Sequence, residues 1–290
     1  MNILVFGEIV WDIIEEKEHL GGAPLNFAAH TAQLGNNLSI VSAVGKDRLG
    51  SQALQELAKL SIDTQFVQVL KKAMTGTVQV KLDHGQPKYR IIEKVAYDFI
   101  DFDEMDTRLL SEFDVFYFGT LAQRNWKSRN TLAKIFTHCS FQHIFCDLNL
   151  RKACYSKEII ASSIAQCTML KLNDEEVEEV SKLLFDTNAA GLTEFWEMLS
   201  NRFSNVKIMI ITLGKEGCRI ITKDDDLHIP AEPCLVKDTI GAGDAFSAAF
   251  VNEYLKQGDL ELAGRKANKM AAFVASSDGA IPELPGDYFQ

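Results

Sequence analysis

Short apolar runs recur along the chain at lengths typical of buried β-strands. Six of them are Ile3–Phe6, Ser39–Val44, Val115–Phe118, His143–Cys146, Met169–Leu172 and Lys207–Thr212. Amphipathic stretches with a helical period separate most of these runs. They are Asn26–Leu34, Ser51–Leu60, Asn130–His138, Asp174–Leu184, Leu192–Phe203 and Ala242–Leu255. This alternation predicts an α/β fold in which helices cover both faces of a mostly parallel sheet.

The segment Thr75–Ile92 breaks this alternation. Every second residue from Val78 to Leu82 is apolar, and a turn follows at His84-Gly85-Gln86-Pro87. The pattern predicts an antiparallel hairpin with one face exposed to solvent.

We expect this hairpin to form a small sheet outside the main one, together with Phe66–Val69 and the segment after Gly7. No repeat, low-complexity tract or linker rich in Pro, Gly or Ser divides the chain. We therefore predict one domain over residues 1–290, with an inserted lid formed roughly by residues 8–20 and 65–100.

Charge and cysteine content narrow the class of protein. Forty acidic and thirty basic residues leave a net charge of −10, which argues against a nucleic-acid or anionic-membrane surface. The six cysteines show no C-x-x-C spacing, as expected for reduced thiols of a cytosolic protein. The first residues do not resemble a signal peptide, and no run of about 18 apolar residues predicts a membrane span. We expect a cytoplasmic protein.

Several common sites are absent from the sequence. It contains no G-x-x-x-x-G-K-[ST], no strand-linked G-x-G-x-x-G, no H-E-x-x-H and no G-x-S-x-G. Its six histidines are scattered without paired ligand spacing, so a structural zinc site is not expected.

The segment from Asp238 to Phe246 joins a glycine-rich loop to an apolar helix. The small residues Gly241, Ala242 and Gly243 allow backbone N–H groups to approach a phosphate at the positive end of this helix. Asp244 would repel an anion that was only bound there, so the pattern suggests a base that accepts a proton from an attacking hydroxyl. A capped helix with a small-residue start is the alternative interpretation.

Two glycine motifs, Gly21–Ala28 and Asp238–Asp244, together resemble those of the ribokinase-like carbohydrate kinases of the phosphofructokinase B type. Gly21-Gly22-Ala23-Pro24-Leu25-Asn26-Phe27-Ala28, followed by Leu34-Gly35, is similar to the first glycine motif of that family. Asp238-Thr239-Ile240-Gly241-Ala242-Gly243-Asp244 is similar to the second, and the likeness covers essentially the whole chain.

The resemblance implies roles for individual residues. Asp244 matches the catalytic base, and the N–H groups of Gly241 through Asp244 match the anion hole. Asp12, Gly22 and Asn26 match positions that bind sugar. A short carboxylate and an amide can each hydrogen-bond to the hydroxyls of a polyol. Without the glycine motif, Asp12 would be interpreted as a solvated acid at a strand end.

The resemblance also implies metal and nucleotide sites. Asn173 and Glu176 resemble an Asn-x-x-Glu motif that organises Mg²⁺ and its waters, but the same spacing is a capping box, and both can hold. Asp238 and the turn at Gly279 fall where a monovalent cation such as K⁺ would bind. The positions that fall on the nucleotide side are Thr212, Gly214, Gly217 and Asn268.

The substrate expectation follows from two segments. The Gly-Gly-Ala-Pro-x-Asn motif and the segment Asp147–Arg151 look more like fructokinases than ribokinases or adenosine kinases. Arg151 would neutralise phosphate or substrate charge, or else form a surface ion pair. We expect an ATP-dependent kinase acting on a primary hydroxyl of fructose, with ribokinase or 2-keto-3-deoxygluconate kinase as alternatives.

Two hypotheses from other classes of protein remain. A catalytically silent sugar sensor would be expected to lack Asp244 or the glycines, and a nicotinamide-dependent oxidoreductase would need a glycine-rich turn after the first strand. The expected partners are a small sugar and ATP. The lid would either pair into a homodimer or cap a monomer.

Overall fold

The computed structural model describes the chain except for residues 16, 84–85, 188–190, 287 and 289–290. Its strands are β1 (Asn2–Phe6), β2 (Val10–Ile14), β3 (Lys17–Gly21), β4 (Asn37–Gly45), β5 (Val67–Leu70), β6 (Gly76–Asp83), β7 (Gln86–Ile91), β8 (Val115–Phe118), β9 (His143–Asp147), β10 (Met169–Asn173), β11 (Ile208–Thr212), β12 (Cys218–Ile221) and β13 (Asp226–Ile229). Its α-helices are α1 (Ala23–Gln33), α2 (Arg48–Lys59), α3 (Thr107–Leu110), α4 (Trp126–His138), α5 (Lys157–Gln166), α6 (Asp174–Phe185), α7 (Leu192–Arg202), α8 (Ala242–Gln257) and α9 (Leu260–Ala275). Among the described residues, no helix is both long and apolar enough to cross a membrane.

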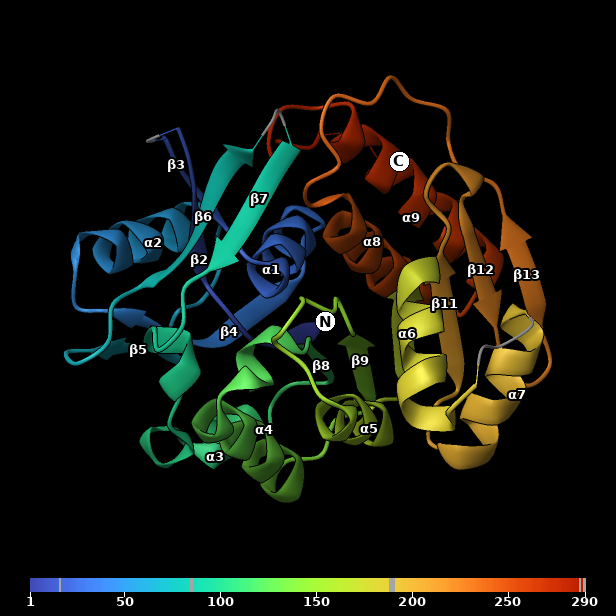
Figure 1. The fold of residues 1–290 in the computed structure, drawn as a ribbon, viewed down its shortest axis with the longest axis horizontal. Coiled ribbons are helices and arrows are strands. Elements are labelled where there is room, and N and C mark those ends of the chain that lie inside the picture. Colours follow the sequence, from blue (N-terminus) through green and yellow to red (C-terminus); the bar gives the residue numbers. More distant parts are fainter. Residues whose placement is uncertain (16, 84–85, 188–190, 287, 289–290) are drawn as a thin grey trace.

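A nine-stranded sheet forms the centre of the molecule, with the order β13-β12-β11-β10-β9-β8-β1-β4-β5 (Figure 1). Within this sheet the strands β5, β4, β1, β8, β9, β10 and β11 run parallel to one another. The strands β12 and β13 at the other edge are antiparallel. The mostly parallel sheet expected from the sequence is thus confirmed. The ranges predicted from periodicity did not include α3, α5, α9 or the β12–β13 hairpin.

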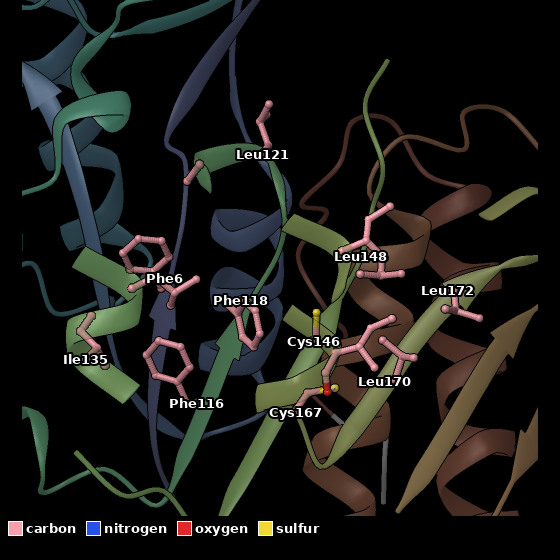
Figure 2. Packing of buried hydrophobic residues seen from close by; sticks show 14 of the residues in the cluster. Phe6, Phe116, Phe118, Leu121, Ile135, Cys146, Leu148, Cys167, Leu170 and Leu172 are labelled. Carbon is pink, nitrogen blue, oxygen red and sulfur yellow. Dashed lines mark hydrogen bonds between the residues drawn. The ribbon is translucent and has the colours of Figure 1, made fainter. Parts of the chain in front are cut away.

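Both faces of this sheet are buried. In β1, Leu4 and Phe6 belong to one core cluster and Ile3 and Val5 to the other, because successive side chains of a strand point to opposite faces. Helices α4, α5, α6 and α7 contribute to the first cluster, and α1, α2, α8 and α9 to the second. Figure 2 shows the first cluster, in which Phe116 and Phe118 lie near Phe6. This burial explains why the strands read as continuous apolar runs.

A second, four-stranded sheet has the order β3-β2-β6-β7. Its two hairpins, β2–β3 and β6–β7, are joined by parallel pairing of β2 with β6. The sequence correctly predicted a small sheet that contains this hairpin and the segment after Gly7, whereas the turn residues 84–85 lie outside the described residues.

One strand assignment was wrong. The segment Phe66–Val69 does not join the small sheet, because β5 pairs in parallel with β4 at the edge of the main sheet. Phe66 is buried in one core cluster while Val67 packs against the other, so this short run has the two-faced burial of a main-sheet strand.

Candidate active site

Helices α1 and α8 bring Asn26 and Asp244 into contact, although the two residues lie 218 positions apart. The Asn26 Nδ2 group donates a hydrogen bond of 2.8 Å to Asp244 Oδ2, and both side chains are buried. Burial, with the neighbouring Asp147 carboxylate, raises the pKa of Asp244 to about 7, while Asn26, Lys171 and Arg151 act in the opposite direction. A carboxylate with a pKa near neutrality suits general-base catalysis.

The glycine-rich turn positions this carboxylate at the start of α8. Gly241 is the N-cap residue with a φ of +81°, and a Cβ there would lie 2.7 Å from the Ala280 carbonyl oxygen. Only glycine fits both constraints without strain. Ala242, Gly243 and Asp244 form the first turn of this helix. The Ala242 N–H group donates to the Thr239 carbonyl oxygen at 3.2 Å, whereas the N–H groups of Gly243 and Asp244 have no partner within the helix. The turn therefore has the chemistry of an anion site.

A buried ion pair lies beside this turn. The Lys171 Nζ atom is 2.9 and 3.1 Å from the two carboxylate oxygens of Asp147, and Ser247 Oγ donates a bond of 3.0 Å to the same carboxylate. A Cβ on Gly243 would lie 3.2 Å from Lys171 Nζ, so the ammonium reaches the anion turn. Burial works against the charge, but Asp147 and the nearby Glu176 and Asp244 raise the pKa of Lys171, which keeps it protonated.

Our sequence reasoning missed Lys171. The available signal was a lone lysine inside the apolar strand Met169–Asn173, in a sheet whose two faces are buried. A charge at such a position requires a partner and therefore marks a site of interest.

The residues of the Asn-x-x-Glu motif form a capping box at the start of α6. Asn173 Oδ1 accepts from the Glu176 N–H group at 2.8 Å, and Glu176 accepts from Asn173 N at 2.9 Å and from Leu150 N at 2.6 Å. The capping interpretation is confirmed. Within the described chain no group of three or more His, Cys, Asp or Glu is arranged to hold a metal ion, so the magnesium role stays a prediction.

The expected sugar-binding residues gather near β2 and the start of α1. Gly22 has a φ of +112°, and a Cβ there would lie 2.7 Å from the Glu8 carbonyl oxygen. Asp12, on β2, is partly buried, and burial raises its pKa while Arg151 and His19 oppose that shift. Arg151 is exposed, and its positive charge also acts to lower the pKa of Asp244.

The expected nucleotide-side residues lie around the end of β11. Thr212 ends that strand, and Gly214 begins a short 3₁₀ turn. Gly217 has a φ of +95°, and a Cβ there would lie 2.1 Å from the Ile229 carbonyl oxygen. Asn268 donates to the carbonyl oxygens of Ile229 and Pro230 at 3.1 and 2.9 Å. These contacts hold the backbone of this region together, and nucleotide contact stays a prediction.

The expected cation-binding residues lie on two adjoining segments. The Asp238 N–H group donates to the Ala275 carbonyl oxygen at 3.2 Å, and an ion pair of 3.7 Å joins Lys237 to Asp278. Asp238 Oδ1 accepts from Ile240 N at 3.0 Å, and Gly279 has a φ of +77° in an exposed turn. The two segments are therefore neighbours, and the cation itself stays a prediction.

Comparison with known proteins agrees with this geometry. The pfkB family carbohydrate kinase model matches residues 2–286. A Pyrococcus horikoshii protein described as an uncharacterized sugar kinase is 28% identical over 298 residues, covering 96% of this chain and 91% of its own. Its crystal structure with ATP has a TM-score of 0.83 at 27% identity and covers 96% of this chain and 94% of that one.

Two other relatives have more specific names. A nucleoside kinase of Methanothermobacter thermautotrophicus is 30% identical, covering 91% of this chain and 81% of its own. Fructokinase-2 of Zea mays is 25% identical, covering 98% of this chain and 91% of its own. Because the family model spans nearly the whole chain and the fold and polar cluster agree with it, this protein belongs to the pfkB family of carbohydrate kinases.

Proposed function

We propose that this carbohydrate kinase transfers the γ-phosphoryl group of ATP to a primary hydroxyl of a neutral sugar, with fructose as the preferred acceptor. The observation that carries the proposal is the buried Asp244 carboxylate, held by Asn26 at the N-terminus of α8. It combines a base of suitable pKa with an adjoining anion site.

The chemistry would proceed as an in-line displacement. The sugar oxygen forms a bond to the γ-phosphorus while the bond to the bridging oxygen of ADP breaks, and Asp244 accepts the hydroxyl proton. The N–H groups of Gly243 and Asp244 in the first turn of α8 would face the negative charge on the phosphoryl oxygens, and Lys171 adds a fixed positive charge beside Gly243.

The sugar would lie between the main sheet and the small sheet, with Asp12, Gly22, Asn26 and Arg151 as its contacts. The Asn26 Oδ1 atom is buried and has no hydrogen-bond partner among the described residues, so it is available to a sugar hydroxyl. Asp12 is on β2, so closure of the small sheet as a lid would bring its carboxylate to the sugar and exclude water. The same sheet is the surface through which a homodimer would form.

Asn173 and Glu176 would act on Mg²⁺ through its water molecules. Two oxygen lone pairs of the Glu176 carboxylate accept backbone bonds, which leaves further acceptor capacity for such waters. The ion would neutralise phosphate charge. A monovalent cation between Asp238 and Gly279 would stiffen the turn that precedes Gly241, and equal rates in potassium and in a bulky organic cation would argue against it.

The nucleotide would lie beyond the anion turn, near Thr212, Gly214, Gly217 and Asn268. Gly217 permits the close backbone approach there, and Asn268 fixes the adjoining strand end. This side of the site is common to all the acceptors considered, so it does not discriminate among them.

Relatives named fructokinase support the fructose assignment, whereas the relative named nucleoside kinase supports a different acceptor. Ribose and 2-keto-3-deoxygluconate are the other sugars considered, and a silent sugar sensor is disfavoured because Asp244 and its glycines are present. A coupled assay of ADP release across fructose, ribose, 2-keto-3-deoxygluconate and adenosine tests the proposal. Fructose should give the highest kcat/KM. A preference for the nucleoside or the sugar acid would refute the fructose assignment but would still be consistent with a kinase.

A further inference from the structure

Two buried polar atoms near the candidate site lack hydrogen-bond partners. They are the Tyr97 hydroxyl and the Arg124 Nη1 atom, for which the described part of the chain offers no partner. Tyr97 is 0% exposed, and the Arg124 side chain is 8% exposed. Nearly all buried polar groups in folded proteins are hydrogen-bonded, so these two donors require a partner from outside the described residues, either an ordered water or a bound ligand.

The rest of the Arg124 guanidinium is fully engaged. Its Nε and Nη2 atoms donate to the two Asp98 carboxylate oxygens at 2.8 and 2.9 Å, and Nη2 also donates to the Ile92 carbonyl oxygen at 2.6 Å. The Tyr97 ring centroid lies 4.9 Å from the guanidinium carbon, and the thiol of Cys154, a weak acceptor, is also near. The charge of Arg124 is therefore balanced, and Nη1, to which the described residues offer only the weakly accepting Cys154 thiol, keeps donor capacity for a ligand.

Tyr97 packs against the base of the small sheet. A Cβ on Gly76 would lie 2.7 Å from a Tyr97 ring carbon and 2.9 Å from the Ile9 carbonyl oxygen. Gly76 begins β6 and pairs with Val10 of β2, the strand that carries Asp12. The unpartnered donors therefore adjoin the side of the site on which we place the sugar.

Glu8 lies on the same side of the site. Its side chain is buried, and a Cβ on Gly22 would lie 2.7 Å from the Glu8 carbonyl oxygen and 3.4 Å from its Cγ atom. Burial raises the pKa of this carboxyl group to about 7, and the charges of Arg151, Asp244 and Arg124 also act on it. A small cavity of about 10 Å³ at the strand ends is lined by Glu8, Pro24, Tyr117, Thr120 and Leu121, among others. The 3₁₀ turn Leu121–Arg124 begins at this cavity and ends at Arg124.

We propose that Tyr97 and Arg124 determine specificity by donating hydrogen bonds to an uncharged oxygen at the non-reacting end of the acceptor. This inference rests on the proposed kinase function. A hydroxyl or ring oxygen fits because Asp98 already balances the Arg124 charge. A carboxylate or phosphate at this end would instead approach Glu8 and Asp98 without a free positive charge to offset the repulsion.

Tyr97→Phe tests the inference, with Tyr254→Phe on α8 as the matched control. The Tyr97 hydroxyl has no partner within the described residues, so its removal should leave the melting temperature unchanged. It should raise the KM for sugar by about 2- to 10-fold, the value of one neutral hydrogen bond, and leave the KM for ATP unchanged. The acceptor with the highest kcat/KM and its monodeoxy analogues are assayed with both variants and with the wild type.

For the wild type, kcat/KM should be about 10-fold or more lower with one of the monodeoxy analogues, because that analogue also lacks the oxygen that accepts the charge-assisted bond from Arg124. For that analogue the Tyr97→Phe penalty should shrink. Phosphoryl transfer to a neutral sugar with equal kinetics for Tyr97→Phe and Tyr254→Phe would overturn the inference while the proposed function stands. A preference of the wild type for fructose 6-phosphate would also overturn it, and transfer to no acceptor at all would overturn both.

Discussion

Replacing Asp244 with Asn removes the proposed base with the least disturbance of the site. Asn keeps the size of the side chain, and its carbonyl oxygen still accepts the bond of 2.8 Å from Asn26. An alcohol attacks poorly unless its proton is accepted as the new bond forms, and positioned bases contribute roughly 10²–10⁴-fold. We expect kcat to fall by about that factor. The affinity for sugar should stay within a few-fold of the wild type, and the affinity for ATP should stay within a few-fold or increase.

The pKa of about 7 sets the pH dependence. Because only the ionised carboxylate accepts the proton, log(kcat/KM) of the wild type should rise with pH below about 7 and level off above it, and this rise should be absent from the variant. A pH-independent wild-type profile between pH 5 and 8 would contradict the assignment of this pKa to the base.

The same shift predicts an effect on stability. Since the folded-state pKa of Asp244 exceeds its usual value of 3.8, the native state holds the proton more tightly and wild-type stability should fall as pH rises from about 4 to 7. The shift is about 3 pH units, so Asp244→Asn should be more stable above pH 7 by at most about 4 kcal/mol. Urea unfolding at pH 5 and pH 8 measures this difference.

The control is Asp259→Asn, which changes an acid at the N-cap of the neighbouring helix α9. Because Asn is as good an N-cap as Asp, this variant should retain wild-type kcat and stability. The general-base role would be refuted if Asp244→Asn retained more than about a tenth of wild-type kcat while chemistry is shown to be rate-limiting.

Three further changes test the surroundings of this base. Lys171→Met leaves the buried Asp147 without its ion pair and should lower the free energy of unfolding by about 3–5 kcal/mol, whereas adding Asp147→Asn should restore stability in urea unfolding but not kcat. Glu176→Gln should raise the Mg²⁺ concentration needed for half-maximal rate more than it changes the KM for sugar, and equal shifts in both would argue for a capping role alone. Deleting residues 83–88 should weaken sugar binding and raise ATP hydrolysis relative to transfer, and unchanged values of both would show that the small sheet is not a lid.

Periodicity allowed the main elements to be predicted because it is a local property. The run Ile3–Phe6 is apolar throughout, and in the structure both faces of β1 are buried. Phe66–Val69 is equally short and apolar except for Gln68, yet no local feature tells which sheet such a run joins. Its assignment failed because the partner, β4, is chosen by long-range packing.

The sequence by itself determined the α/β alternation, the early hairpin and the two glycine motifs. Strand period, helix period and the need for small residues at a turn all depend on residues that are close together in the sequence. Only the tertiary structure decided that Asn26 meets Asp244, that Lys171 reaches the anion turn, and that Tyr97 and Arg124 are buried together at the base of the small sheet. These relations depend on how the strand ends and the helix N-termini converge in space. The pKa of Asp244 belongs to the same group, because burial and the nearby charges that shift it are contributed by distant segments of the chain.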